Sequence, residues 1–339
     1  MLPKVTLKEV AAQAGVSYQT VSKVLNHQVK ASPETEQRIM QAVQELGYRP
    51  NQIARNMRAG RSHMIGFSWV SSSPERPNHI QDQFLTSMVE EAEQVGYHLL
   101  PFPFRDGDVQ VESYRKLIDT GLVDGFVLAS VDFNDPRITF LLERGFPFVA
   151  FGRSNPELDF PYVDVDGTDG TRQEVEYLIS RGHSAIAVLA WPESSRVGGD
   201  RLKGYFKAMQ SAGLEINPEW VNRRGDSTFD SGRQITLELL QIPTAYRPTA
   251  IVALNDQQAT GAIFAAQSAG LQVGRNISIV GFDDAPMAQY LQPPLTTIRQ
   301  PIKLAGRKCV ELLVNLMRGI QPEERQILLK PELILRASA

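Results

Sequence analysis

The stretch from residue 5 to residue 26, VTLKEVAAQAGVSYQTVSKVLN, decides how the first part of this chain folds. Its TLKE segment predicts a capping box, in which the Thr6 hydroxyl accepts the N–H of Glu9 and the Glu9 carboxylate reaches back to the N–H of Thr6. A helix that starts there would end at Gly15, which supplies a left-handed turn, and Ser17 would cap a second short helix. Two helices joined by a three-residue turn that contains glycine form a helix-turn-helix.

A third helix is expected behind this pair, because Ser32 can cap it, Pro33 fits the first helical position and Gly47 ends it. The sequence therefore predicts an all-α helix-turn-helix head at residues 1–49. A further short helix and linker are expected at residues 50–61, where Asn51 can serve as the cap after Pro50. A helix this short needs a partner helix or DNA to hold it, so it is expected to fold on binding.

The second helix of a helix-turn-helix lies in the major groove of DNA, with its first residues facing the base edges. Gln19 can pair with adenine and Lys23 can reach guanine or phosphate, although a solvated polar face is the alternative. Thr20 and Asn26 are expected to touch phosphates. The candidate DNA contacts of the head are Thr6, Ser17, Tyr18, Gln19, Thr20, Ser22, Lys23 and Asn26.

The charge distribution agrees with a nucleic-acid partner for the head. Residues 1–61 carry nine Lys and Arg against four acids, a net charge of +5, so the rest of the chain carries −8 of the total of −3. A basic head on an acidic body is typical of a polyanion-binding module attached to a domain with another task, although a solvated basic face gives the same charge count.

The composition of the 339 residues indicates a globular, non-membrane protein with two or three folding units. No apolar run is long enough to span a bilayer, and residues 1–10 lack the pattern of a secretory leader, so a cytoplasmic, nucleoid-associated location is expected. The single cysteine, Cys309, lies in an apolar-periodic stretch and is expected to be a buried structural thiol. The five histidines form no metal-binding spacing, so neither a metal nor a cofactor is predicted.

From residue 62 onward, short apolar runs alternate with helical patterns, which indicates an α/β body with parallel sheets. The clearest strands are expected at 65–70, 126–129, 148–151, 185–190, 250–254 and 277–281, and helices at 84–96, 171–181 and 201–212. A later strand is expected at 332–336.

Ligands of parallel sheets bind outside the carboxyl ends of the strands, and the informative side chains follow the predicted strands. Aromatic faces for sugar rings and charged or amide groups for hydroxyls are what a polyol site needs. Alternatives exist for several of these residues: Trp69, Trp191 and Phe229 could be core or rim aromatics, and Asp283 could cap a helix. Helix-capping roles are expected for Asp166 and Asp256, and a structural role for His183.

The sequence resembles the LacI/GalR family of transcription regulators. The motifs that carry the resemblance are VTLKEVAAQAGVSYQTVSKVLN at 5–26, GYRPNQIARNMR at 47–58, RGHSAIAVL at 181–189, RLKGY at 201–205, ALNDQQATG at 253–261, VGFDD at 280–284 and PPLTTIRQP at 293–301. The head motif is highly specific, and the later motifs are weaker but follow the family's order.

The resemblance implies a two-lobed body like type I periplasmic sugar-binding proteins, at residues 62–339. Its first lobe is expected at about 62–161 and 290–322, and its second at about 162–289 and 323–339. The resemblance also places Asn51, Ala54 and Met57 in the minor groove, where Met57 replaces the family's usual wedging leucine. With the motif matches included, the candidate effector contacts are Trp69, Phe84, Arg153, Trp191, Arg201, Phe229, Asn255 and Asp283.

The expected function is that of a sequence-specific repressor, a homodimer that binds a pseudo-palindromic double-stranded DNA operator under control of a small sugar. A regulator that responds to a nucleobase or another metabolite is the alternative, and a sugar-binding carrier or a hydrolase is the rival class. For hydrolysis, Asp283 and Asp284, or Asp164 and Asp166, could be imagined as paired carboxylates, but adjacent positions at a strand end point to opposite sides. No nucleophile elbow or phosphate-binding glycine loop is present, so no catalytic residue is predicted.

Overall fold

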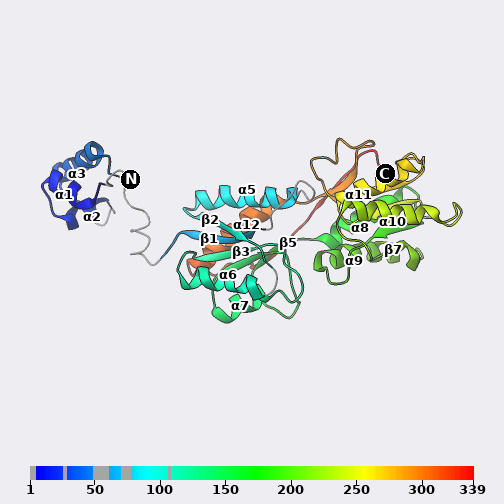
Figure 1. The fold of residues 1–339 in the computed structure, drawn as a ribbon, viewed down its shortest axis with the longest axis horizontal. Coiled ribbons are helices and arrows are strands. Elements are labelled where there is room, and N and C mark those ends of the chain that lie inside the picture. The colour runs from blue at the N-terminus through cyan, green and yellow to red at the C-terminus, as the bar shows by residue number, and fades with distance from the viewer. Residues whose placement is uncertain (1–4, 26–28, 49–60, 70–77, 106–107) are drawn as a thin grey trace. The chain divides into compact units, whose positions relative to one another are not determined.

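The computed structural model describes residues 5–25, 29–48, 61–69, 78–105 and 108–339 (Figure 1). The chain divides into two compact units, Met1–Ser62 and His63–Ala339. Four candidate DNA contacts lie outside the described residues, namely Asn26, Asn51, Ala54 and Met57.

The first unit contains α1 (Leu7–Ala14), α2 (Tyr18–Leu25) and α3 (Pro33–Leu46) around a small apolar core. The predicted capping box between Thr6 and Glu9 is present, and its Glu9 carboxylate accepts the Thr6 N–H at 2.7 Å and the Thr6 hydroxyl at 2.8 Å. Gly15 and Gly47 end α1 and α3 with φ of 65° and 60°, the left-handed conformation that glycine adopts readily. The predicted helix-turn-helix is confirmed.

The first lobe of the second unit is built on a parallel six-stranded sheet in the order β11-β5-β4-β3-β1-β2. Two helices, α5 and α12, form the core on one face, and α6 and α7 form it on the other (Figure 1). The elements are β1 (Met64–Trp69), α5 (His79–Gln94), β2 (His98–Pro103), α6 (Asp108–Asp119), β3 (Gly125–Leu128), α7 (Pro136–Arg144), β4 (Phe148–Phe151), β5 (Tyr162–Val165), α12 (Ile302–Met317) and β11 (Gln326–Leu329).

The second lobe repeats this plan with the strand order β12-β10-β9-β8-β6-β7, in which only β12 runs antiparallel to its neighbour among the described pairs. Helices α8 and α9 cover one face, and α10 and α11 cover the other. The elements are α8 (Gly167–Ser180), β6 (Ile186–Leu189), α9 (Arg196–Ser211), a 3-10 turn (Pro218–Trp220), β7 (Val221–Asn222), α10 (Phe229–Gln241), β8 (Ala250–Ala253), α11 (Asp256–Ser268), β9 (Ser278–Asp283), β10 (Thr296–Arg299) and β12 (Glu332–Ile334).

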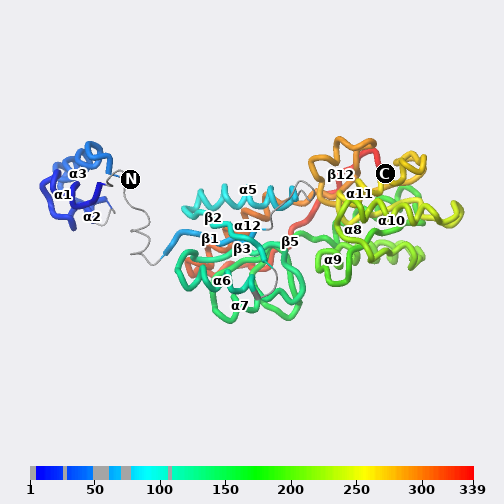
Figure 2. The backbone as a smooth tube through the Cα atoms, viewed as in Figure 1, coloured from blue at the N-terminus to red at the C-terminus, as the bar shows by residue number. Residues whose placement is uncertain are grey.

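The sheet order corrects the predicted lobe boundaries at three strands. β5 and β11 belong to the first sheet and β10 to the second, the reverse of the predicted assignment. The chain passes between the lobes after each of these strands, at β5–α8, β10–α12 and β11–β12, so the boundaries lie about where the strands end (Figure 2). The predicted boundaries lie too early in the chain, because β5 and β10 each pair with the strand directly before them, β4 and β9, and β11 pairs with β5, far away in the sequence.

Two structural expectations about single residues are confirmed. Cys309 is fully buried on α12 in the core of the first lobe, where burial raises the pKa of its thiol well above the usual range. The His183 ring bonds the hydroxyls of Thr249 and Ser278, both at 2.9 Å, and so ties the starts of β8 and β9 together.

Candidate functional site

The exposed face of α2 carries the predicted DNA contacts that the structure describes. Val21 and Val24 are buried against α1 and α3, which leaves Tyr18, Gln19 and Lys23 exposed on the helix. Ser17 Oγ accepts the N–H of Thr20 at 3.1 Å and thereby fixes the start of the helix. Side chains at the first turn of α2 are therefore presented to solvent in the arrangement that a recognition helix needs.

A cleft of about 650 Å³ opens at the carboxyl ends of strands from both sheets of the second unit. Its walls come from the ends of β3, β4 and β5 in the first lobe and of β6, β8 and β9 in the second. Five of the eight candidate effector residues line it: Arg153, Trp191, Arg201, Asn255 and Asp283. This is where the strand-end rule places a ligand.

Arg201, on α9, lies beside two aromatic rings in the second lobe. Its guanidinium carbon lies 3.7 Å from the centre of the Phe282 ring and 5.4 Å from that of Trp191, so the cation contacts two π-systems. It donates to the Leu254 carbonyl, and its Nη2 lies 3.4 Å from the Asp283 carboxylate. The side chain is nearly fully buried, so its position is fixed before any ligand arrives.

Asp283 completes this arrangement at the end of β9. Its φ of 121° is rare for a residue other than glycine, a strain typical of functional sites. Its carboxylate accepts from Gln300 Nε2 at 2.6 Å. Burial raises the pKa of this carboxyl, and the neighbouring Arg201 opposes that shift.

The next residue, Asp284, points elsewhere. Its two oxygens bind Arg299 at 2.8 Å and Arg336 at 2.6 Å. Asp283 and Asp284 therefore do not face each other across one site.

Asn255 and Asp256 have structural tasks at the start of α11. Asn255 Oδ1 accepts the Gln258 N–H and its Nδ2 donates to the Ser227 carbonyl, both at 2.8 Å. Asn255 is therefore the cap of α11, which corrects the expectation that Asp256 caps it. Asp256 instead accepts from the Thr297 hydroxyl and from the Ala285 N–H, both at 2.6 Å. Asp166 caps α8 through the Asp169 N–H, as predicted.

Arg153, from the end of β4, links the two lobes. Its Nε donates to Asp164 at 2.7 Å in its own lobe, and its Nη2 donates to Asp200 on α9 of the other lobe at 2.8 Å. Asp200 also pairs with Arg196, one turn earlier on α9. The resemblance suggested Arg153 as an effector contact, and the structure adds a role in holding the lobes together.

Three candidate residues are not among the lining residues of the cleft. The assignment of Phe84 is corrected: its side chain is 1% exposed and stacks on Phe151, with ring centres 4.4 Å apart, in the core of the first lobe. Trp69 packs against the same core at the end of β1. Phe229 is exposed at the start of α10 and lies 5.9 Å from the Phe264 ring.

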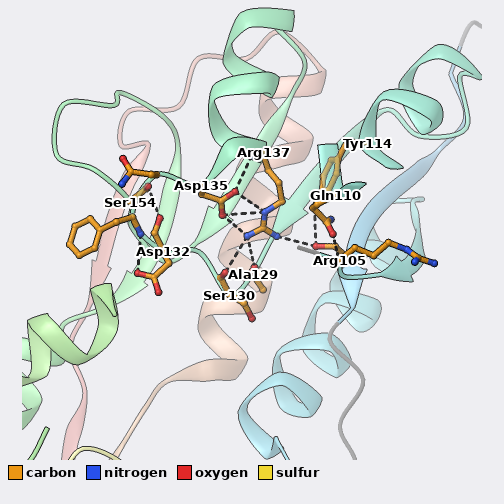
Figure 3. Close-up of polar contacts among 12 residues, drawn as sticks. Arg105, Gln110, Tyr114, Ala129, Ser130, Asp132, Asp135, Arg137 and Ser154 are labelled. Carbon is orange, nitrogen blue, oxygen red and sulfur yellow. Dashed lines mark hydrogen bonds and ion pairs between the residues drawn. The ribbon is translucent and has the colours of Figure 1, made fainter. Parts of the chain in front are cut away.

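The loop between β3 and α7 forms part of the first lobe's wall and is anchored from behind by Arg137. This arginine is 2% exposed, pairs with Asp135 and donates to the carbonyls of Ala129 and Ser130 at 3.1 and 3.2 Å (Figure 3). At the loop's tip, Asp132 Oδ1 accepts the Arg196 N–H of the second lobe at 2.7 Å. The buried ion pair thus fixes a loop that reaches across the cleft.

Several lining residues were not predicted from the sequence as ligand contacts, most clearly His79, Asp164, Arg196 and Asp200. Asp164 could have been found by the strand-end rule, had β5 been predicted. Asp200 lies directly before Arg201, but only the tertiary structure shows that it faces Arg153. Among the described residues no cluster of His, Cys, Asp or Glu could hold a metal, and no helix is long and apolar enough to cross a membrane.

Comparisons with known proteins agree with both parts of the structure. The profile described as "Bacterial regulatory proteins, lacI family" matches residues 6–51, and the "Periplasmic binding protein-like domain" matches residues 175–339. The HTH-type transcriptional regulator CelR of Thermobifida fusca is 33% identical over 339 residues, with 98% of each chain covered.

Solved structures of regulators are similar to most or all of this chain. A regulatory protein of the LacI family from Chloroflexus aggregans is 59% identical, with a TM-score of 0.79 over 82% of this chain and 98% of that one. A CelR–cellobiose complex is 32% identical, with a TM-score of 0.75 over 99% and 100%. A lac repressor dimer bound to operator and an anti-inducer is 32% identical, with a TM-score of 0.86 over 99% of each chain. The chain therefore belongs to the LacI family of bacterial regulatory proteins and is a DNA-binding transcriptional regulator.

Proposed function

We propose that this regulator is a cytoplasmic repressor of genes for carbohydrate use, and that a small sugar bound in the cleft controls its hold on DNA. The observation that carries the proposal is the cleft itself, where aromatic rings and buried charged groups converge at the strand ends of two lobes. Trp191 offers a ring face and Asp283 offers oxygens that can accept from sugar hydroxyls. The similarity to CelR, solved with cellobiose, supports the same ligand class.

The repressor acts as a homodimer in this proposal, as the operator-bound lac repressor does. Two heads read the halves of a pseudo-palindrome, and the segment at residues 50–61 joins each head to its body. Sugar that bridges the cleft changes how the lobes meet along the three crossovers, and so alters whether both heads can dock. Coupling of this kind is worth about 1 to 3 kcal/mol, or roughly 5- to 150-fold in DNA affinity.

The proposal includes no catalysis, because the relatives are regulators and the neighbouring carboxylates of Asp283 and Asp284 bind different partners. Selection of bound duplexes from a random library tests the regulator against a sugar carrier or a hydrolase. A repressor enriches a palindromic site, and a carrier or hydrolase enriches none.

A thermal-shift screen tests the ligand. Sugars that bind the folded chain raise its melting temperature by mass action. A response to nucleobases alone, with none to any sugar, would reject the sugar effector. Asp283→Ala is expected to remove the ligand response and leave operator binding intact.

Replacing Gln19 tests the recognition helix. Gln19→Ala is expected to change the preferred base in each half-site, at a cost of about 1 to 3 kcal/mol for the original site. Gln44→Ala, on the exposed face of α3, is the matched control and should leave the selected sequence unchanged. An unchanged preference in Gln19→Ala would contradict the assignment of α2.

A further inference from the structure

The charged groups that line the cleft disfavour the binding of an anion. We infer that the cleft accepts uncharged sugars and rejects sugar phosphates and other anionic ligands, an inference that rests on the proposed sugar-binding function. It follows from three features of the described residues: the partners of the guanidinium groups, the caps of the helix N-termini, and the number of carboxylates.

All three arginines in the described lining already have carboxylate partners. Arg153 donates to Asp164 at 2.7 Å and to Asp200 at 2.8 Å. Arg196 also pairs with Asp200, and its guanidinium carbon lies 5.5 Å from the centre of the Phe133 ring. A phosphate would have to displace these partners, since a guanidinium binds phosphate through the same fork of N–H groups that a carboxylate uses.

Arg201 also has protein partners for its guanidinium group. One nitrogen donates to the Leu254 carbonyl, another faces Asp283, and the guanidinium carbon lies 5.4 Å from the centre of the Trp191 ring and 3.7 Å from that of Phe282. Its Nε has no hydrogen-bond partner in the part of the chain that the structure describes, and that atom is enclosed by protein and not open to the cleft. The guanidinium of Arg201 can still donate a hydrogen bond to a sugar hydroxyl beside Asp283. An uncharged hydroxyl does not require a cation that is free of a carboxylate partner, as a phosphate does.

Helix N-termini are the second kind of anion site, and five of them reach the cleft, those of α5, α8, α9, α10 and α11. Each is capped by a side chain of its own segment: Asn78, Asp166, Ser195, Thr228 and Asn255. At α9 the Asp132 carboxylate of the opposite lobe also accepts the Arg196 N–H, at 2.7 Å. The place where a phosphate would sit on α9 already holds an anionic group.

Carboxylates outnumber guanidiniums in the lining. Five aspartates, Asp164, Asp200, Asp226, Asp256 and Asp283, face three arginines, an excess of two negative charges when all are ionised. Behind this wall lies a further fully buried carboxyl, Glu174. Burial raises the pKa values of Asp164, Asp256 and Asp283, and the charge of Asp283 raises that of Asp256 further. An added phosphate would meet the same repulsion, whereas sugar hydroxyls can donate to these oxygens.

Calorimetric titration with matched probes tests the inference. Glucose, maltose and cellobiose are compared with glucose 6-phosphate, maltose 6′-phosphate, cellobiose 6′-phosphate and inorganic phosphate on the full chain. The phosphorylated form of any sugar that binds is expected to bind at least about tenfold more weakly, and inorganic phosphate not at all. Equal or tighter binding of a phosphorylated form would overturn the inference while leaving sugar binding intact. Inorganic phosphate that binds and competes with the sugar would also overturn it.

A charge-matched pair of variants shows whether the arginine partners cause the discrimination. Asp200→Asn releases Arg153 and Arg196 from one carboxylate, so the preference for the neutral sugar over its phosphate is expected to fall about tenfold. Asp119→Asn, at an exposed pair with Arg144 in the first lobe, makes the same chemical change outside the cleft lining and should leave the preference unchanged. Asp164→Asn serves as a second variant if Asp200→Asn unfolds. A preference unchanged in both cleft variants would overturn the inference.

Discussion

Glu174 lies on the inner face of α8, fully buried, with no hydrogen-bond partner at either carboxylate oxygen among the described residues. Burial raises the pKa of its carboxyl well above the usual range, the negative charges of Asp256 and Asp283 raise it further, and only Arg201 acts in the other direction. Asp256 and Asp283 both accept hydrogen bonds that a carboxylate needs, and Glu174 accepts none. Of these three buried carboxyls, Glu174 is therefore the one that we expect to hold a proton.

The raised pKa makes stability depend on pH in a defined direction. Because the folded chain binds a proton that the unfolded chain has released, this contribution is complete below the unfolded pKa of about 4.5 and is lost as pH rises through the folded pKa. Glu174→Gln, which cannot ionise, is expected to be more stable than the wild type at pH 8, by roughly 1 to 3 kcal/mol, and no more stable at pH 4. Thermal unfolding measured across this range checks the prediction.

The control for this prediction is Glu176→Gln, on the same helix. Its carboxylate is half exposed and paired with Arg172, so its removal should shift stability by less than about 0.5 kcal/mol at any pH. Parallel pH profiles for the wild type and Glu174→Gln would show that Glu174 is ionised in the folded chain, against the expectation.

At the scale of single residues, the sequence predicted which polar side chains belong to the site better than it predicted which way each side chain points. Arg201, Asn255 and Asp283 were found because each follows a strand or belongs to a recognisable motif, and all three line the cleft. Phe84 was misplaced because an aromatic residue near a helix start fits a binding wall and a core equally well. The buried contact between Arg137 and Ser68 could not be predicted, since Ser68 lies far away in sequence and meets Arg137 only through the fold.

Glycines fix how closely paired helices approach. A Cβ added at Gly204 of α9 would lie 2.2 Å from the Thr168 carbonyl oxygen of α8, a distance that no real contact tolerates. Gly204→Ala is therefore expected to force α8 and α9 apart and to cost about 1 to 3 kcal/mol in stability. Denaturant unfolding gives the measurement.

Gly199, on the same helix, is the natural control because a Cβ there meets nothing within 4 Å. Gly199→Ala should stabilise the chain by up to about 1 kcal/mol, the gain of alanine over glycine inside a helix. If both alanine variants change stability equally, close packing at Gly204 is not the cause.

At the scale of elements, the fully buried strands β3, β6 and β8 were predictable and the edge strands β2 and β11 were not. β3, β6 and β8 are buried throughout and read as continuous apolar runs, as strands covered on both faces do. β2 and β11 are partly exposed at the sheet edges, and the two prolines of β2 hide it further, so neither shows a clear pattern. The helices α5 and α9 begin earlier than predicted because Asn78 and Ser195 cap them ahead of the apolar stretch.

For the whole second unit, the contacts between lobes set how firmly the cleft is held. Asp132→Ala removes the carboxylate that accepts the Arg196 N–H at the start of α9. A carboxylate at a helix N-terminus is worth about 0.3 to 1 kcal/mol, so sugar affinity is expected to fall by roughly two- to fivefold. Titration with the sugar found in the thermal-shift screen measures this. Asp119→Ala, at an exposed pair within the first lobe, should leave the affinity unchanged.

The pairing of β5 with β11 has a consequence for synthesis of the chain. β5 ends at Val165, but its partner is made only at Gln326–Leu329, after the entire second sheet except β12 has left the ribosome. α12, which fills the core beside β1 and β4, emerges equally late. The lobe that starts first is thus completed only shortly before the other, and nascent chains must keep one of its apolar faces uncovered until the final few dozen residues are added.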